Sequence, residues 1–148
     1  MKLDKGIDTP PALPTPAPMI DADSAAFWAA TCDGRLMLGF CTACGEHFFY
    51  PRPLCPLCGA WDATLRESAG LGVVHSWTTV YHGVDEYADT GPYMLAYVTL
   101  DEGPTLLTNI VECANGIAVN DLVEVVFHRT AAAAALPRFR PVHGGEGL

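Results

Sequence analysis

Two pairs of cysteines constrain the fold of this chain more than any other feature of its sequence. Cys41 with Cys44 and Cys55 with Cys58 form two Cys-x-x-Cys motifs; ten residues lie between the motifs, and a glycine follows each one. Two thiolates three positions apart face one ion only where the backbone folds into a tight knuckle, which glycine permits. Two knuckles together place four sulfur ligands around Zn²⁺ and leave no position for water. The spacing therefore predicts a structural zinc site.

The four cysteines also have alternative uses. Two disulfides, or four unrelated buried thiols, are one alternative. A single iron is another, because four sulfur ligands in a tetrahedron suit either metal. Rubredoxins hold iron between similar knuckles with a longer intervening chain, so the short hairpin expected here favours zinc. His47 lies between the motifs, and we interpret it as a surface or outer residue because four cysteines already complete the coordination.

Length and composition limit the class of protein. The chain has 148 residues, of which 50% are hydrophobic, enough for one ordinary core and a small satellite module. Every apolar stretch ends well before the ~18 residues of a membrane span, and the N-terminus lacks a signal-peptide pattern. Together with reduced cysteines, this predicts a cytoplasmic protein without a membrane span. Cys32 and Cys113 fall outside the motifs, and we interpret both as small buried hydrophobic residues rather than nucleophiles.

The charge is distributed unevenly along the chain. The formal net charge is −9, and the segment from Glu67 to His128 contains nine Asp or Glu residues but no Lys or Arg. A surface built from that segment repels phosphate backbones. The sequence therefore predicts that no nucleic acid is a partner.

The first forty residues divide into two parts. Five prolines crowd residues 1–20, which favours an extended, disordered Pro-rich tail. Residues 21–40 form a helical segment in which Asp21 and Asp23 offer N-caps and Asp33-Gly34 supplies the stop. Phe27 and Trp28 are adjacent and diverge by ~100° around a helix. One ring is expected in the core, and the other is a candidate partner contact.

The remainder of the chain is predicted to be β-structure. A rubredoxin-like zinc ribbon is expected over residues 41–62, followed by a barrel over 63–141 and a frayed C-terminus over 142–148. The barrel strands are five short segments with β-rich or alternating patterns, at 73–81, 93–100, 105–111, 122–128 and 136–141. Five such strands suggest a small closed barrel, and Gly70 with Gly72 permits the bend that closure needs. The fold class is therefore mainly β, with an N-terminal helix, a zinc ribbon and a five-stranded OB-fold barrel.

The order of these motifs resembles one protein family. The aromatic helix, the two knuckles, Pro51-Arg52 between them and Ser68-x-Gly70-x-Gly72 before the barrel are similar to the OB-fold proteins with an N-terminal rubredoxin-like zinc ribbon, catalogued as domain of unknown function number thirty-five. The resemblance covers about residues 21–141. Members of that family lie beside genes for thiolase-like enzymes, including thiolases, retro-aldolases and acyltransferases, and form complexes with them. The resemblance implies a non-catalytic accessory subunit that binds a thiolase-like enzyme in acyl-CoA metabolism.

The sequence offers no independent active site. A thiolase needs a nucleophilic cysteine with acid–base partners, and the motif cysteines are committed to metal. Glu112 precedes Cys113, and its negative charge raises the pKa of that thiol rather than lowering it. The histidines are scattered with no motif that joins them. We therefore predict that the chain is not itself an enzyme.

Two further functions are alternatives. The first is an acyl-CoA binding module, whose phosphate contacts come from the partner or from basic residues outside the acidic segment, namely Arg52, Arg66, Arg129, Arg138 or Arg140. The second is an OB-fold that binds single-stranded nucleic acid on aromatic platforms such as Trp77, Tyr81, Tyr93 and Tyr97. The acidic charge of the barrel segment disfavours this second alternative.

Aromatic residues near the ribbon are candidate contacts with a partner or with acyl-CoA. They are Phe48, Phe49 and Arg52 on the ribbon hairpin, together with Phe27 and Trp28 on the helix. Alternation along a strand sends Phe48 and Phe49 to opposite sides, so only one of them packs between ribbon and barrel. Apolar rings beside an arginine are typical of an interface core.

Overall fold

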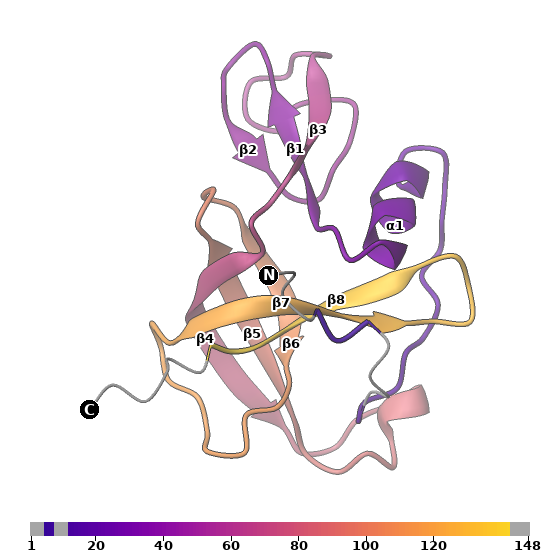
Figure 1. Cartoon of the computed structure of the whole chain (residues 1–148), viewed down its shortest axis with the longest axis vertical. Helices are drawn as coiled ribbons and strands as arrows, with labels where there is room; N and C mark the ends of the chain where they lie inside the picture. Colours follow the sequence, from indigo (N-terminus) through magenta and orange to yellow (C-terminus); the bar gives the residue numbers. More distant parts are fainter. Residues whose placement is uncertain (1–4, 8–11, 143–148) are drawn as a thin grey trace.

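A small three-stranded sheet stands on one end of a closed barrel in the computed structural model of the chain, which describes residues 5–7 and 12–142 (Figure 1). Helix α1 (Ala25–Cys32) lies beside both units. The sheet has the order β2-β1-β3 and consists of β1 (Met37–Cys41), β2 (His47–Phe48) and β3 (Ala63–Glu67). The barrel has the order β4-β5-β6-β8-β7 and consists of β4 (Leu71–Val80), β5 (Tyr93–Leu100), β6 (Thr105–Ile110), β7 (Leu122–Arg129) and β8 (Ala135–Pro141). The predicted mainly β fold, with helix, ribbon and five-stranded barrel, is confirmed.

Alternation of side chains explains why the barrel strands form where they do. In β5, Ala96, Val98 and Leu100 point inward and are buried, while Tyr97 between them is exposed. Such a period of two is the signature of a strand with one face on the core. β5 pairs antiparallel with β4 on one side and β6 on the other. The bounds of β5 are those predicted from the sequence.

Two glycines allow the barrel to close between β4 and β7. Gly70 has a φ of +74°, and its carbonyl accepts a hydrogen bond from Val125 N at 2.8 Å. Gly72 pairs with Val123, and a Cβ on Gly72 would lie 2.5 Å from the carbonyl oxygen of Thr99. Only a residue without a side chain fits such a close backbone approach. The role predicted for both glycines is confirmed.

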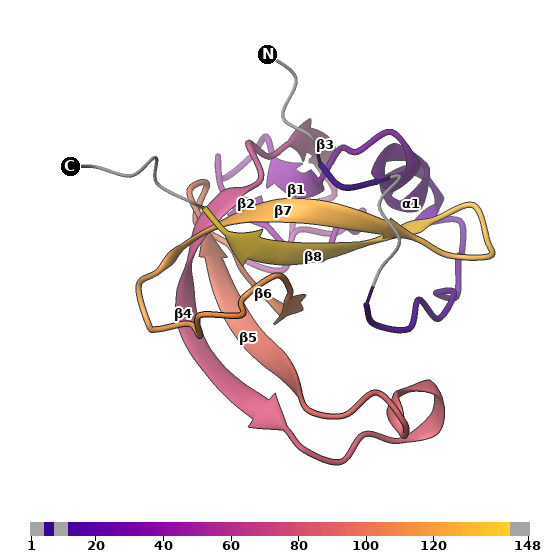
Figure 2. The same cartoon turned by 60° about the horizontal axis from the view of Figure 1, so that its bottom comes forward.

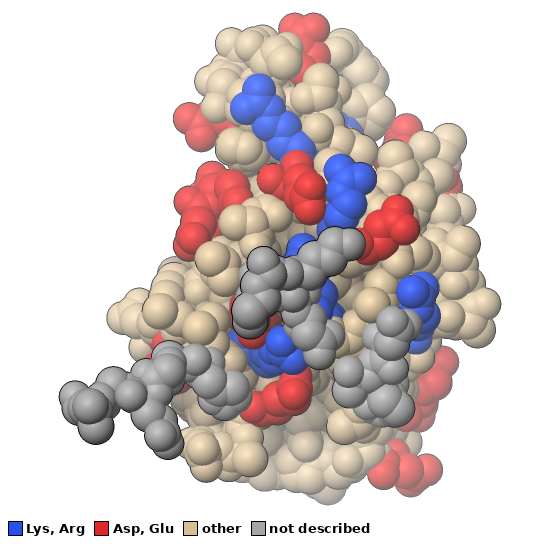
Figure 3. All heavy atoms as spheres, viewed as in Figure 1, with Lys and Arg blue, Asp and Glu red and all other residues tan. Residues whose placement is uncertain are grey.

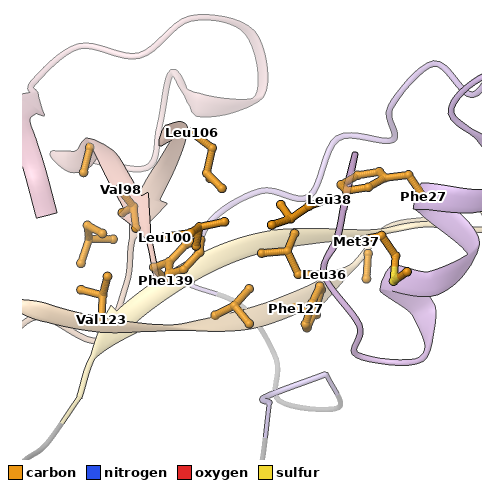
Figure 4. Close-up of a cluster of buried hydrophobic side chains, with 14 of the residues drawn as sticks. Phe27, Leu36, Met37, Leu38, Val98, Leu100, Leu106, Val123, Phe127 and Phe139 are labelled. Carbon is orange, nitrogen blue, oxygen red and sulfur yellow. The ribbon is translucent and has the colours of Figure 1, made fainter. Parts of the chain in front are cut away.

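The main hydrophobic core runs without a break from helix α1 into the barrel (Figure 4). Phe27 and Leu38 lie at the helix end of this cluster, and Phe139 lies among the barrel strands. The hydroxyl of Thr31 accepts a hydrogen bond from Ala135 N at 3.0 Å, which ties α1 to β8. Phe27 is therefore the ring of the adjacent pair that packs in the core, where it is 1% exposed.

Helix α1 begins after Ser24, which is its N-cap and makes no side-chain capping bond, so neither Asp21 nor Asp23 caps the helix as predicted. Hydrogen bonds between Asp21 and Ser24 instead close the turn before the helix. Asp21 Oδ1 accepts a hydrogen bond from Ser24 N at 2.8 Å, and Ser24 Oγ accepts one from Asp21 N at 3.0 Å. The side-chain hydrogen bond to Ser24 lowers the pKa of the Asp21 carboxyl. At the other end Gly34 has a φ of +70°, which stops the helix where the sequence predicted.

The described parts of the Pro-rich segment lie against the barrel. Lys5 O accepts a hydrogen bond from Phe127 N at 2.9 Å, and Pro14 O accepts one from Arg138 Nη2 at 2.6 Å. Phe127 and Arg138 of the barrel thus bind backbone carbonyls of the N-terminal segment. The described part of this segment is therefore not the free tail that the proline content predicted over 1–20. Residues 1–4 and 8–11, like most of the C-terminus expected to fray, lie outside the described residues.

The ribbon sheet is larger than the range 41–62 predicted from the cysteines. β1 begins at Met37 and β3 ends at Glu67, and the two strands pair along their whole length. The first strand of the range expected for the barrel, β3, thus belongs to the other sheet. A cation–π contact supports this pairing, because the Arg66 guanidinium carbon lies 3.4 Å from the Phe40 ring centroid.

Candidate metal centre and adjoining groove

The two cysteine motifs fold into equivalent knuckles. In the first, Gly45 N donates to Cys41 O at 2.8 Å, and Cys41 N donates to the carbonyl of the residue five positions on at 3.0 Å. In the second, Gly59 N donates to Cys55 O at 3.0 Å, and Cys55 N makes the matching bond at 2.9 Å. Gly45 and Gly59 have φ values of +75° and +80°, a left-handed conformation that glycine adopts without strain. The predicted knuckles are therefore present.

The knuckles bring the four sulfur atoms together. All four lie within 4.8 Å of one another, with Cys41 Sγ 3.6 Å from Cys58 Sγ and Cys44 Sγ 3.8 Å from Cys55 Sγ. Four sulfur donors gathered in this way fit the closed tetrahedral coordination of a structural Zn²⁺. His47 is not among the gathered groups, since its ring packs on Phe40 with 4.9 Å between centroids.

The electrostatics of the four thiols favour a bound cation. Burial opposes ionisation of Cys55, but the backbone N–H groups of Cys58 and Leu57 outweigh it and lower the pKa of this thiol to about 7. A backbone N–H of Glu46 lowers the pKa of Cys44, yet burial and the neighbouring thiols outweigh that bond and raise it to about 12. The Cys55 thiol thus ionises readily, whereas burial and the neighbouring thiols oppose ionisation of Cys44. The positive charge of a divalent cation at the centre of the four sulfurs would stabilise the additional thiolates.

Phe48 packs against the two knuckles inside the ribbon. It is 4% exposed and forms a small buried cluster with Cys41 and Cys55. Its ring covers Gly39, where a Cβ would collide with it. Phe48 is therefore the member of the Phe48–Phe49 pair that faces the ribbon interior.

The structure separates the five candidate contact residues into two groups. Phe27 and Phe48 are buried within the chain and offer no exposed surface. Trp28 and Phe49 are half-buried, and Arg52 is exposed. Phe27 lies at the centre of an aromatic cluster, with ring centroids 4.9 Å from Trp28 and 5.8 Å from Phe49.

A groove of about 300 Å³, the junction groove, opens where helix, ribbon hairpin and barrel meet. Its wall includes Trp28, Phe49, Tyr50, Tyr87, Leu107 and Arg138. The indole N–H of Trp28 is buried and finds no acceptor among the described residues. Tyr50 was not among the predicted contact residues, although it ends the aromatic run that begins at Phe48.

Arg138 is held inside the protein. It is 2% exposed and donates hydrogen bonds to Pro14 O at 2.6 Å, to the Tyr87 hydroxyl at 3.0 Å and to His128 Nδ1 at 2.9 Å. Burial lowers the pKa of the Arg138 guanidinium. Burial, and then the charge of Arg138, also lower the pKa of His128. Arg138 therefore ties the N-terminal segment to the barrel and is not presented at the surface.

Other basic side chains have acidic neighbours. Figure 3 shows basic and acidic groups interspersed on one face, from the ribbon down over the barrel. Arg140 lies 2.9 Å from Glu124 and 3.3 Å from Glu112, and Arg35 lies 3.3 Å from Glu67. Among the described residues, no helix is long and apolar enough to cross a membrane.

Cys113 has the surroundings of a packed thiol. Its sulfur lies 3.5 Å from Met94 Sδ, and burial raises the pKa of the thiol. An activated nucleophile has a lowered pKa and an adjacent base. The structure thus supports the interpretation of Cys113 as a structural residue.

Comparison with known proteins identifies the class as a zinc ribbon joined to an OB-fold. Residues 28–62 match the rubredoxin-like zinc ribbon domain of ChsH2, and residues 65–128 match the C-terminal OB-fold domain of ChsH2. The chain is 37% identical over 92 residues to a DUF35 domain-containing scaffold protein of Methanothermobacter thermautotrophicus, covering 60% of this chain and 68% of that protein. The chain belongs to the DUF35 family, as the sequence motifs indicated, and structural zinc is the cofactor that this ribbon and its four gathered sulfurs support.

Two further similarities are informative. The chain is 35% identical over 127 residues to a probable enoyl-CoA hydratase alpha subunit of Thermomonospora curvata, covering 85% of this chain but 40% of that protein. It therefore spans less than half of that curated relative. A solved structure described as an Ltp2-ChsH2(DUF35) aldolase has a TM-score of 0.72 and 34% identity, covering 84% of this chain and 98% of the matched chain.

Proposed function

We propose that this protein is a non-catalytic accessory subunit that binds a thiolase-like enzyme in acyl-CoA metabolism. The observation that carries the proposal is the match to almost the whole DUF35 chain in a structure described as an aldolase. The name of the Methanothermobacter relative, a scaffold protein, supports the same role. So does the name of the Thermomonospora relative, which refers to a subunit of an enzyme that acts on CoA esters.

The zinc site serves the fold in this proposal. Cys41, Cys44, Cys55 and Cys58 hold one Zn²⁺, whose role is to fix the ribbon, since four protein ligands leave no position for a substrate. The ligands must stay reduced, which supports a reducing compartment such as the cytoplasm.

The ribbon–helix junction is the proposed contact region. Trp28 and Phe49 present half-buried rings, and the exposed Arg52 lies on the same hairpin as Phe49. Rings of this kind, flanked by an arginine, supply much of the binding energy in protein interfaces. Phe27 contributes by positioning Trp28 and Phe49 from the interior, where its ring contacts both, whereas Phe48 packs inside the ribbon.

Direct binding of an acyl-CoA by this chain is a second candidate. The aromatic wall of the junction groove favours it, because the groove is large enough for part of a ligand. The phosphates of CoA weigh against it. Arg138 is enclosed and Arg140 is paired with two glutamates, so phosphate contacts would fall to other basic residues or to the partner enzyme.

Co-expression with a thiolase-like enzyme from the same organism tests the proposal. We expect the two proteins to elute together in size-exclusion chromatography, and the enzyme to lose solubility or activity when expressed alone. We also expect no acyl-CoA turnover by this chain alone. Separate elution, with full activity of the enzyme alone, would contradict the proposal.

A further inference from the structure

An exposed apolar face on the barrel continues from the junction groove. A second groove of about 200 Å³, the barrel groove, lies across β4, β5 and β6 and is lined by Trp77, Leu95, Tyr97 and Leu107, among others. Leu107 lines both grooves. The two grooves therefore form one continuous surface, which we name the docking face.

The register of the strands explains how these side chains gather. Tyr97 on β5 lies directly opposite Leu107 on β6 and opposite Ser76 on β4. Residues opposite each other in neighbouring strands project from the same side of the sheet. Figure 2 shows β4, β5 and β6 as neighbouring strands on one side of the barrel.

The apolar side chains of the docking face are exposed to solvent to an extent that indicates an interaction site. Tyr97 is 48% exposed and Leu107 is 57% exposed, and the two lie opposite each other on β5 and β6. Single exposed apolar residues are ordinary, but adjoining ones on neighbouring strands mark an interaction site. Trp77 also lines the barrel groove but pairs with Ala96, so it does not project from the same side as Tyr97. At the junction end, the indole N–H of Trp28 is without an acceptor among the described residues, so this ring is not fully satisfied within the isolated chain.

Charge identifies the occupant. Between Glu67 and His128 the chain has no Lys or Arg, and the exposed Asp85 and Glu86 stand next to Tyr87, which lines the junction groove. A nucleic acid is repelled by this border. A second copy of the chain, also with net charge −9, is repelled as well. A protein surface with an apolar centre and a basic rim is complementary.

We propose that the docking face receives the thiolase-like partner, through a patch of that enzyme with apolar residues at its centre and Lys or Arg at its rim. This inference rests on the proposed function and adds the surface that performs it. It extends the contact region from the ribbon hairpin across the barrel as far as Leu107 and Tyr97.

Point variants in the co-expressed complex test the inference. Leu107→Lys and Tyr97→Ala alter the docking face at exposed positions, where folding is spared. Leu122→Lys is the matched control, because Leu122 is 63% exposed at the start of β7 and does not line either groove. Affinity and association rate are measured by biolayer interferometry against partner enzyme that is separated from the co-expressed complex rather than expressed alone. Zinc content and circular dichroism serve as checks of folding.

We expect each docking-face variant to weaken the complex at least about tenfold, while Leu122→Lys stays within about twofold. Asp85→Asn with Glu86→Gln should slow association and flatten its salt dependence, because these charges lie at the border of the face.

The outcomes separate the two proposals. If the unaltered protein binds the partner and the docking-face variants bind equally well, the docking face is wrong and the proposed function stands. If the unaltered protein does not bind the partner at all, the proposed function fails first. If the unaltered protein instead forms dimers that Leu107→Lys dissociates, or binds single-stranded DNA through Tyr97, the occupant is overturned.

Discussion

The ribbon and the barrel are stabilised in opposite ways. Among the described residues, the ribbon encloses a buried cluster of only Cys41, Phe48 and Cys55, and two of these three are proposed metal ligands. The barrel and helix share a larger cluster that includes Val98 and Phe139, and the first residues of β1, Met37 and Leu38, also belong to that cluster. A unit as small as the ribbon cannot bury enough apolar surface to fold unaided, whereas the barrel can. The metal thus replaces a hydrophobic core in one half of the molecule.

Removing the metal ligands should have the largest effect on stability and should unfold the ribbon while the barrel stays folded. In Cys44→Ser with Cys58→Ser, we expect zinc to be lost and the ribbon to unfold, because structural zinc contributes about 10–16 kcal/mol to such modules. Amide hydrogen exchange should show protection lost in the two knuckles and in β2, and retained in the barrel strands and at the start of β1, where Met37 and Leu38 belong to the main core.

The matched control replaces the other two cysteines. Cys32→Ser with Cys113→Ser should retain one zinc per chain by elemental analysis, because neither sulfur belongs to the gathered group. Loss of barrel protection together with the ribbon would mean that the two units fold as one. Iron in place of zinc would reject the assignment of the metal.

A cavity in the barrel core should destabilise the barrel without affecting zinc binding by the ribbon. Leu106 is 3% exposed on the inner face of β6, and Leu106→Ala should lower the free energy of unfolding by about 2–5 kcal/mol. Zinc content should not change. Leu107→Ala, one position along on the exposed face, should change stability by no more than about 0.5 kcal/mol. Chemical denaturation of both variants measures the difference.

Overpacking the ribbon should test whether it has any core of its own. In Gly39→Ala the new methyl group meets the Phe48 ring, and overpacking of this kind costs about 1–3 kcal/mol. We expect faster zinc release to a chelator, with the unfolding midpoint of the barrel unchanged. The same substitution at Gly103, where nothing lies within 4 Å of the added Cβ but φ is +114°, should leave zinc release unaltered.

Much of this arrangement was predictable because it depends on local pattern. The knuckles follow from cysteine spacing and two glycines, and β5 follows from strict alternation. Closure at Gly70 and Gly72 followed from the lack of a side chain. Each of these features is decided by residues near one another in the sequence.

Other features depend on contacts that the sequence does not display. The hydrogen bond from Arg138 to Pro14 joins residues 124 positions apart. No local sequence pattern indicates that the proline-rich segment binds a buried guanidinium. The pairing of β3 with β1 likewise depends on whether this short strand joins the ribbon sheet or the barrel. The burial of Phe48 depends on the same choice, since Phe48 lies inside the ribbon. Tyr97 was predicted as a possible platform for nucleic-acid bases, but Leu107 was not predicted to lie beside it, because the two become neighbours only through the register of two strands.

The smallest expected effect concerns pH and the barrel alone. Burial, followed by the charge of Arg138, lowers the pKa of His128, so the folded barrel favours the neutral imidazole. Its contribution to stability is present above the unfolded pKa of about 6.5 and is lost as the pH falls through the lower folded value. We expect the barrel to lose stability as the pH falls below about 6.5. His128→Gln, which keeps an acceptor for Arg138, should reduce that slope. An NMR titration of His128 measures its pKa directly, and hydrogen exchange of the barrel amides separates this effect from release of zinc by the ribbon. A His128 that titrates above its ordinary value would show that the hydrogen bond from Arg138 does not hold the ring neutral.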